Sequence, residues 1–335
     1  MANLKTAIVT GATGGLGRNL TEKLLQDGWR VIACGRNQTI GKQLNTTFHA
    51  FDLADKHSVL QHFSSADVVF HCAALSSPWG HFDDFYQANV LATENVIHAV
   101  RKYNIGKLIH VSTPSIYFDF HDHLQVKEDF VAKNFANDYA YSKFLAEQVV
   151  QNAYDIDSVI IRPRGIFGAY DTAVLPRLLK LAEKGFLPLI QRHGRQAGDA
   201  LVDVTYVENV VYALLLATEH DVPRAMKFNI SNDEPYTVKQ LYEKICQTLS
   251  LNVKFKNLPY TVIDQVAKAM EFQAKLFNQG KKEPLITRYS AGTIAFDQTL
   301  DIQRARQYLG YQPLFNINTG LQRYAEWLAE NKIKY

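Results

Sequence analysis

Cysteine is scarce in this chain of 335 residues, which has only Cys34, Cys72 and Cys246. Their number is odd and they lie far apart, so neither a disulfide framework nor a zinc cluster is indicated. Long hydrophobic runs are also missing, because the longest run, 210–217, is far shorter than a bilayer span. The start of the chain lacks the pattern of a signal peptide. We therefore expect a soluble cytoplasmic protein with reduced thiols and no membrane span.

Neither sign of charge is in excess. The 36 Lys and Arg residues oppose 33 Asp and Glu residues, which gives a net charge of +3, and no basic stripe is present. Nucleic acid is therefore not an expected partner. His121 and His123 flank Asp122, but no further cluster of ligands accompanies them. We predict no metal site.

Short apolar runs alternate with helical patterns in the first half of the chain. Runs of four to six apolar residues without strict alternation are typical of strands that are buried on both faces. Strand–helix–strand alternation predicts an α/β fold with a doubly wound parallel sheet of the Rossmann type. One long helix is expected over 84–103. The predicted strands are 7–9, 31–34, 48–51, 68–71, 108–112 and 158–162.

The pattern loosens after about residue 165. We predict a dinucleotide-binding domain over 1–165, to which 200–232 returns. A smaller, mostly helical substrate-binding domain is expected from 166–199 and 233–335. Predicted elements after residue 165 are helices near 175–184, 208–219, 238–249, 262–277, 302–309 and 318–331, and strands near 201–204 and 227–230.

A glycine-rich turn follows the first predicted strand and begins the first helix. Gly11 suits a tight turn, Gly14 lets the backbone approach a pyrophosphate, and Gly17 lets helix and strand pack closely. The N-terminus of the helix then offers unpaired N–H groups to phosphates. The strand before the turn and the helix after it make a dinucleotide site the favoured interpretation. The residues predicted to hold the cofactor here are Gly11, Thr13, Gly14, Gly15, Leu16 and Gly17.

The second predicted strand ends at Gly35 and is followed by Arg36. An enzyme that uses NAD usually has an acidic residue here for the ribose 2′-hydroxyl, whereas arginine suits the 2′-phosphate of NADPH. The sequence therefore favours NADPH, with NAD as the alternative. Further predicted cofactor contacts follow the third and fourth strands, and they are Asp52, Leu53, Ala73 and Ala74.

Tyr139 and Lys143 lie four residues apart at the start of a predicted helix. That spacing places both side chains on one face. A nearby ammonium lowers the pKa of a tyrosine from its usual value near 10, and the same lysine can bind the nicotinamide ribose. The pair can then exchange a proton while hydride moves to or from a nicotinamide. At the end of the fifth strand, Thr113 is our first choice for a hydrogen bond to the substrate oxygen, with Ser112 second.

Together these motifs resemble the extended short-chain dehydrogenases/reductases, also called the NAD-dependent epimerase/dehydratase family. The resemblance covers nearly the whole chain. It implies that Asn89 supports the active site from beneath and that Pro163 lies beside the nicotinamide. It also implies a homodimer through the helices that contain 84–103 and 139–153. Besides the glycine turn and the catalytic set, the matching stretches include 71–74, 162–163, 206–210, 228–230 and 309–311.

Within that family the chain is most similar to the 3β-hydroxysteroid dehydrogenase-like branch, which includes bacterial 2-alkyl-3-oxoalkanoate reductases. The similar stretches are 74–89, 112–115, 162–164, 175–178 and 284–306. This resemblance implies oxidation or reduction at a 3-hydroxy/3-oxo carbon of a small hydrophobic carbonyl or alcohol, steroid-like or a 2-alkyl-3-oxo acid. The residues expected in the substrate pocket are Ser112, Pro78, Trp79, Tyr117 and Arg164.

Two other functions stay open at this point. One is a nucleotide-sugar epimerase or dehydratase with tightly bound NAD. The family's usual contacts to the nucleotide diphosphate are replaced here by Gly165 and Val202, which weakens that alternative. The other is a non-catalytic protein that senses dinucleotides, against which the intact catalytic set argues.

Two segments are expected to border the substrate. The long stretch 118–138 is aromatic and leads to Tyr139, which is typical of a lid or pocket wall. Helix 262–277 carries apolar residues near helical spacing. Packing against the core of the second domain is the favoured role of this helix, and an entrance for lipids or a membrane surface is the alternative.

Overall fold

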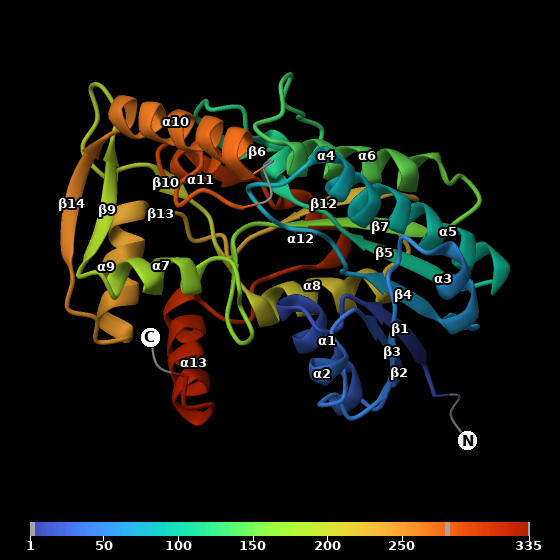
Figure 1. Ribbon diagram of the computed structural model, residues 1–335. Coiled ribbons are helices and arrows are strands. Elements are labelled where there is room, and N and C mark those ends of the chain that lie inside the picture. Colours follow the sequence, from blue (N-terminus) through green and yellow to red (C-terminus); the bar gives the residue numbers. More distant parts are fainter. Residues whose placement is uncertain (1–3, 279–281, 334–335) are drawn as a thin grey trace.

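A seven-stranded parallel sheet runs through the centre of the protein (Figure 1). The structure, a computed structural model, describes residues 4–278 and 282–333. The order β12-β7-β5-β4-β1-β2-β3 reverses direction between β1 and β4, and ligands of such sheets bind beside that reversal. The strands are β1 (Thr6–Thr10), β2 (Arg30–Gly35), β3 (Thr47–Ala50), β4 (Val68–His71), β5 (Lys107–Val111), β7 (Ser158–Pro163) and β12 (Met226–Ile230).

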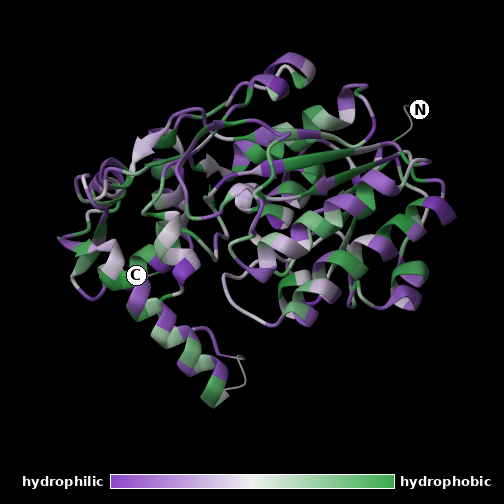
Figure 2. Ribbon diagram, turned by 90° about the horizontal axis from the view of Figure 1, so that it is seen from above, coloured by the Kyte–Doolittle hydropathy of each residue, from purple (hydrophilic) through white to green (hydrophobic). Residues whose placement is uncertain are grey.

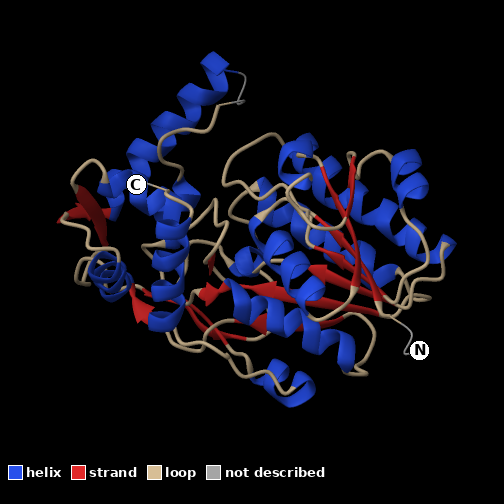
Figure 3. Cartoon of the chain, turned by 90° about the horizontal axis from the view of Figure 1, so that it is seen from below, coloured by secondary structure: helices blue, strands red, loops and turns tan. Residues whose placement is uncertain are grey.

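Both faces of this sheet are covered by helices. Successive residues of one strand contribute to opposite hydrophobic layers, as Ile8 and Val9 do in β1. The central strands are accordingly largely hydrophobic, with helices on either side (Figures 2 and 3). One layer contains α1 (Gly15–Gln26), α8 (Val207–Glu219) and α12 (Gln303–Leu309), and the other contains α3 (Lys56–His62), α5 (Ala92–Lys102) and α6 (Asp138–Asn152). The doubly wound parallel sheet expected from the sequence is confirmed.

The helix expected over 84–103 is interrupted. Its first part is α4 (Phe82–Phe85), a π-helix follows over Tyr86–Leu91, and α5 continues from Ala92. A π-helix is wider by one residue per hydrogen-bonded ring and is frequent at functional sites. Here it contains Asn89, whose side chain is almost fully buried. Apolar spacing alone did not show this interruption, because the segment stays helical throughout.

Smaller sheets accompany the tail of the chain. Most of their strands were not predicted from the sequence, and all of these strands except β9 and β14 have four residues or fewer. The segment 118–138, expected as a lid or pocket wall, contributes β6, which pairs with β15 in a four-stranded sheet. That sheet has the order β13-β10-β15-β6, and β14-β9 and β11-β8 form pairs. The strands are β6 (His123–Val126), β8 (Ile166–Phe167), β9 (Phe186–Gln191), β10 (Leu201–Val202), β11 (Thr205–Tyr206), β13 (Tyr236–Thr237), β14 (Lys254–Pro259) and β15 (Gln298–Leu300).

A separate hydrophobic core holds this part together. It joins α7, α9 and α13 to β9 and β10. We propose the division into 1–165 with 200–232, and 166–199 with 233–335, although β6 and β10 place strands of the first part in the second part's sheet. The remaining helices are α2 (Gln38–Gly41), the 3-10 helix Pro114–Tyr117, α7 (Leu175–Ala182), α9 (Val238–Thr248), α10 (Tyr260–Asn278), α11 (Arg288–Thr293) and α13 (Ile317–Glu330).

Candidate active site

The glycine turn between β1 and α1 depends on two glycines. Gly11 has a φ of +67°, and a Cβ atom there would lie 2.7 Å from the backbone nitrogen of Ala73. A Cβ atom on Gly17 would lie 2.2 Å from the Gly11 carbonyl oxygen. Any side chain at either position would therefore push the turn apart. Gly14, the N-cap of α1, has no side chain to bond the N–H groups of the first helical turn, so these face outward.

A cavity of about 370 Å³ opens at this turn, at the reversal of strand order. It is lined mainly by the segments that follow β1 to β4, with glycines and alanines beside the turn and larger side chains such as Phe51 and Leu53 farther along. Eight of the residues predicted to bind the cofactor line it. These are Gly11, Thr13, Gly14, Arg36, Asp52, Leu53, Ala73 and Ala74.

The other predicted cofactor residues lie outside that cavity's lining. Gly15 faces Tyr170, since a Cβ atom would come within 2.8 Å of the Tyr170 carbonyl oxygen. Leu16 packs in the hydrophobic core. Pro163 is buried at the end of β7.

Arg36 lies at the edge of the cavity with a largely exposed side chain. One of its guanidinium nitrogens is 4.0 Å from a carboxylate oxygen of Asp52, and both side chains are more than half exposed. Such an ion pair is weak in water. The guanidinium is therefore free to turn toward an anion at the ribose end of the cavity.

Hydroxyl groups gather at the carboxyl end of β5. Thr113 caps the 3-10 helix that follows: its Oγ1 accepts a hydrogen bond from the backbone N–H of Ser115 at 3.1 Å. The same hydroxyl donates to Ser115 Oγ at 3.0 Å. The Ser112 hydroxyl is buried and has no hydrogen-bond partner among the described residues.

Tyr139 reaches this cluster from the first turn of α6. Asn137 fixes the start of α6 by accepting a hydrogen bond from the Ala140 N–H at 2.9 Å. The side chains of Thr113 and Ser76 both act on the Tyr139 hydroxyl, and Ser76 was not singled out from the sequence. Burial raises the pKa of Tyr139, and Thr113 and Ser76 oppose the rise.

Lys143 lies one turn after Tyr139, and its side chain is fully buried. Its ammonium donates to the Val111 carbonyl oxygen at 2.8 Å and lies 3.4 Å from Nε2 of His110. Burial lowers the pKa of Lys143 to about 8, against the raising effect of Glu147. The expected lowering of the Tyr139 pKa by Lys143 is wrong for this structure, because the ammonium is directed at Val111 and His110 and burial dominates at Tyr139.

Two buried histidines lie behind Lys143. The rings of His71 and His110 are 5.3 Å apart between centroids. Burial lowers the pKa of both, that of His71 to about 3, and Lys143 lowers them further. Both rings are therefore neutral at physiological pH, so Nε2 of His110 can accept a hydrogen bond from the Lys143 ammonium.

Asn89 ties the loop after β4 to α6. Its side-chain oxygen accepts from the Leu75 N–H at 2.8 Å, and its amide donates to the Ser142 hydroxyl at 2.9 Å. The same loop carries Ser76, so Asn89 holds one hydrogen-bond partner of Tyr139 in place. Asn89 thus joins two segments of the site, and the supporting role that the family resemblance implies stays a prediction.

A second tyrosine enters the site from the far end of the sequence. Tyr289 belongs to α11, and its hydroxyl lies 2.7 Å from Ser115 Oγ. It also influences the charge of Tyr139, whose pKa it raises. The only hint of Tyr289 in the sequence is its place within one of the stretches that support the family resemblance.

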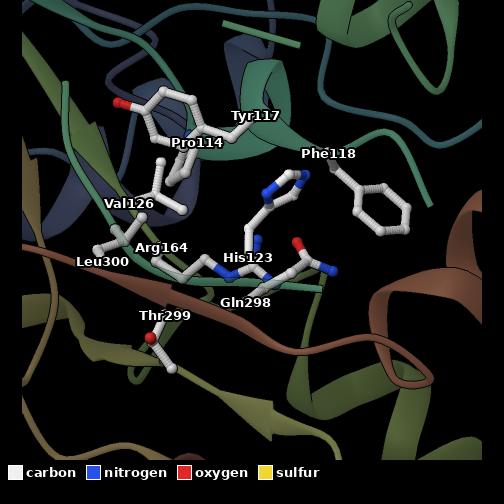
Figure 4. A pocket seen from close by; sticks show the side chains of 9 residues that line it. All are labelled: Pro114, Tyr117, Phe118, His123, Val126, Arg164, Gln298, Thr299 and Leu300. Carbon is white, nitrogen blue, oxygen red and sulfur yellow. The ribbon is translucent and has the colours of Figure 1, made fainter. Parts of the chain in front are cut away.

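The residues expected in the substrate pocket fall into two groups. Pro78 and Trp79 belong to the loop that Asn89 anchors, and both are partly exposed. Tyr117 is buried, and its hydroxyl donates to Asn229 at 2.8 Å and accepts from Arg162. Arg164 lies with His123 and Gln298 around a small cavity beside the 3-10 helix (Figure 4).

Arg164 is a cation without a counter-ion. Its guanidinium makes no ion pair or side-chain hydrogen bond with the part of the chain that the structure describes, and the nearest influences on its charge are Tyr289 and Asp203. Burial lowers the pKa of Arg164. Nε2 of Gln298 is likewise buried and has no partner within residues 4–278 and 282–333. The two side chains therefore present unused donors close to the hydroxyl cluster.

Comparison with known proteins places these features in a family. The model of the NAD dependent epimerase/dehydratase family matches residues 7–231. The chain belongs to this family. It is 36% identical to the uncharacterized protein YbjS of Escherichia coli K12 over 97% of this chain and 98% of that one.

Other relatives have named activities. The chain is 32% identical to a 2-alkyl-3-oxoalkanoate reductase of Shewanella oneidensis, over 96% of this chain and 86% of the relative. It is 28% identical to the human sterol-4-alpha-carboxylate 3-dehydrogenase, decarboxylating, over 95% of this chain and 87% of the relative. The enzyme is accordingly an NAD(P)-dependent oxidoreductase of this family.

The fold is also that of solved structures. MoeE5 in complex with UDP-glucuronic acid and NAD superposes with a TM-score of 0.75 at 19% identity, over 97% of this chain and 99% of that one. At this identity the likeness concerns the fold alone. The present chain's own residues fit a dinucleotide, because Gly11 and Gly17 keep the turn open and the cavity beside it has the size and backbone lining that a pyrophosphate needs.

Proposed function

We propose that this enzyme reduces the 3-oxo group of a bulky, hydrophobic 3-oxo acid to a 3-hydroxy group with NADPH, and catalyses the reverse oxidation. The observation that carries the proposal is the cluster of hydroxyls in which Thr113 and Ser76 act on Tyr139, with Lys143 one helical turn later. Such a cluster can hold a carbonyl oxygen and deliver a proton to it. The names of the reductase and the sterol dehydrogenase among the relatives support the chemistry.

Each residue of the cluster has a distinct proposed role. The Thr113 hydroxyl turns from Ser115 Oγ to donate its hydrogen bond to the substrate oxygen, with Ser112 beside it. Tyr139 delivers the proton as the oxygen gains charge. Lys143 holds the ribose, and Asn89 keeps the Ser76 loop in place. The nicotinamide supplies the hydride when the cofactor is bound.

A carboxylate on the substrate would explain Arg164. Its partly buried guanidinium lacks a counter-ion within the described residues, and it lies near Tyr289, which contacts the catalytic hydroxyls. A 3-oxo acid brings a carboxylate within two bonds of the reacting carbonyl carbon. Arginine binds carboxylates in two parallel hydrogen bonds, which would also fix the orientation of the substrate.

NADPH rather than NADH is the proposed reductant, because Arg36 borders the cavity and is only weakly paired. We also propose a cytoplasmic homodimer through α5 and α6, as the family resemblance implies. Its three free cysteines suit that compartment.

The test is cofactor oxidation, followed by absorbance, with 2-alkyl-3-oxo acids and 3-oxosteroids as substrates. NADPH consumption that falls at least a hundred-fold in Tyr139→Phe, with NADPH affinity retained, would support the proposal. Arg36→Ala should weaken NADPH binding at least ten-fold and leave NADH binding nearly unchanged, since only NADPH carries the 2′-phosphate. Co-purification of NAD with no net consumption of either cofactor would favour an epimerase or dehydratase instead.

A further inference from the structure

Helix α10 projects from the body of the protein (Figures 2 and 3). One side of it is packed inward, where Ala267 and Ala274 are buried. The other side is apolar and open to solvent, with exposed fractions of 64% for Phe272, 61% for Leu276 and 77% for Phe277. Val262 and Val266 extend the same strip toward the start of the helix. Large apolar side chains concentrated on a projecting helix mark an interaction surface.

The charges of α10 are sorted between its two sides. Both of its acidic residues serve the inward contacts: Asp264 forms an ion pair with Arg288 at 2.7 Å, and Glu271 accepts from the Arg288 N–H at 2.7 Å. The exposed charges on the helix are Lys268 and Lys275. Exposed Lys282 and Glu283 follow it, and Glu283 is paired with Arg177 at 3.1 Å. The outward side of the helix thus combines apolar residues with positive charge that is unpaired among the described residues.

This combination favours one occupant over others. A second copy of the chain would bring lysine opposite lysine in a symmetric contact, which is repulsive. An anionic lipid surface offers negative headgroups for the lysines and an acyl boundary for the phenylalanines. We propose that α10 docks on the surface of a bilayer that contains anionic lipids. Among the described residues no helix has the length and hydropathy to cross a membrane, so the binding is peripheral.

The docked surface continues toward the substrate side of the enzyme. The Lys275 ammonium lies 5.8 Å from the ring centroid of Trp79, which belongs to the loop that carries Ser76. Helix α11, which supplies Tyr289, is tied to α10 through Arg288. A docked enzyme would therefore place its active site next to the lipid, and a hydrophobic substrate could enter the site from the bilayer. This last step rests on the proposed function, whereas the docking itself does not.

The test is co-sedimentation of the full-length protein with vesicles. One set is phosphatidylcholine alone, and the other contains about one third phosphatidylglycerol. We expect binding to the anionic vesicles that weakens as salt is added. The variant F272S/L276S/F277S should bind at least ten-fold more weakly. K268Q/K275Q/K282Q should also lose at least ten-fold, because each lysine near an anionic surface strengthens binding about five-fold.

The matched control is Y154S/L314S, which removes two apolar side chains that are 74% and 56% exposed elsewhere. It should bind vesicles like the unchanged protein. All variants should keep their turnover of a short, water-soluble substrate, so a failure of docking is separate from a failure of the proposed reaction.

Three outcomes would overturn the inference. The first is no sedimentation with anionic vesicles at low salt, as expected if α10 meets an acidic protein instead. The second is equal loss of binding in the control variant. The third combines two results: the unchanged protein does not bind vesicles, and light scattering shows a smaller oligomer for F272S/L276S/F277S than for the unchanged protein. That combination would make this surface a contact between copies of the chain.

Discussion

The hydroxyl oxygen of Tyr289 lies 2.7 Å from Oγ of Ser115, although 174 positions separate the two residues. Through this contact helix α11 joins the end of β5. Ser115 accepts a hydrogen bond from Thr113, which is bonded in turn to Tyr139. A continuous chain of hydroxyls thus runs from the catalytic tyrosine to the C-terminal part of the protein. The hydrogen bonding of the Tyr289 hydroxyl therefore influences the orientation of the Thr113 hydroxyl.

Replacing Tyr289 by Phe should lower kcat/KM for the 3-oxo substrate about three- to ten-fold, the effect of losing one hydrogen bond. Affinity for NADPH should not change, because Tyr289 does not line the cofactor cavity. Steady-state kinetics of Y289F, S115A and the double variant would measure this. Since both residues act through one contact, the double variant should be little worse than either single one. Fully additive losses would show that the two residues act separately.

His110 should set the pH at which Lys143 loses its charge. Its neutral ring accepts from the buried ammonium, so it favours the charged form of a lysine whose pKa burial has already lowered to about 8. Replacing His110 by Leu removes this acceptor, and the pKa of Lys143 should fall further. The alkaline decline of kcat/KM should then begin at a lower pH than in the unchanged enzyme.

The measurement is a pH–rate profile of His110→Leu and His110→Asn from about pH 6 to pH 10. Asparagine keeps an acceptor oxygen, so it should restore the position of the alkaline limb at least in part. A purely structural role of His110 would instead lower activity by one factor at every pH, and the midpoint of the decline would stay in place.

The central sheet and the glycine turn could be predicted from the sequence because their causes are local. Buried strands appear as apolar runs, and Gly11 and Gly17 are needed by atoms of the same turn or of a neighbouring strand. The shared face of Tyr139 and Lys143 follows from helical spacing alone. Strands such as β8 and β13 carry too few residues for a pattern, and six-residue β14 was missed because none of its residues is buried and it contains only two large apolar side chains.

The rest of the site depends on contacts between distant segments. Ser76 lies in the loop after β4 and Tyr289 lies in α11, and no spacing rule brings either residue to Tyr139. The direction of the Tyr139 pKa was mispredicted for a related reason. Helical spacing gives the face that Lys143 shares with Tyr139, but only the folded chain shows that its ammonium turns to Val111 and His110.

Arg164 should distinguish a free carboxylate from its ester. The stable 2-alkyl-3-hydroxy acids and their methyl esters are suitable substrates for the oxidation direction. If the guanidinium binds the carboxylate, Arg164→Met should raise KM for the acid about ten- to hundred-fold, the range for a hydrogen bond to a charged group. KM for the ester should change less than about three-fold.

Arg164→Lys keeps the charge but loses the planar pair of donors, and it should recover only part of the affinity for the acid. Kinetics of the two variants on both substrates give a complete cycle. Equal increases of KM for acid and ester would mean that Arg164 shapes the pocket without binding the carboxylate.

The buried histidines should make the fold sensitive to mild acid. Thr93 donates its hydroxyl proton to the Asn89 carbonyl oxygen at 2.6 Å, so toward Nε2 of His71 it can only accept, which fixes the proton of the ring there. Nδ1 of His71 then accepts a hydrogen bond from the Thr10 hydroxyl at 2.8 Å. A second proton on the ring would have to bind Nδ1 and would break that hydrogen bond. Burial, with a further contribution from the charge of Lys143, lowers the pKa of His71 to about 3 in the folded protein, against an unfolded value of 6.5.

Between those two values only the unfolded chain takes up the proton. The free energy of unfolding should therefore fall as the pH drops below about 6.5, with His71 contributing a slope that approaches ~1.4 kcal/mol per pH unit.

Urea unfolding at several pH values from about 7 to 5 would measure this slope. His71→Gln should be less stable at pH 7 but should show a shallower slope, because glutamine does not titrate. His121→Gln is the matched control, since the side chain of His121 is 76% exposed and its loss should leave the slope unchanged. An undiminished slope in His71→Gln would assign the acid sensitivity to other groups, beginning with His110, whose pKa burial and Lys143 also lower.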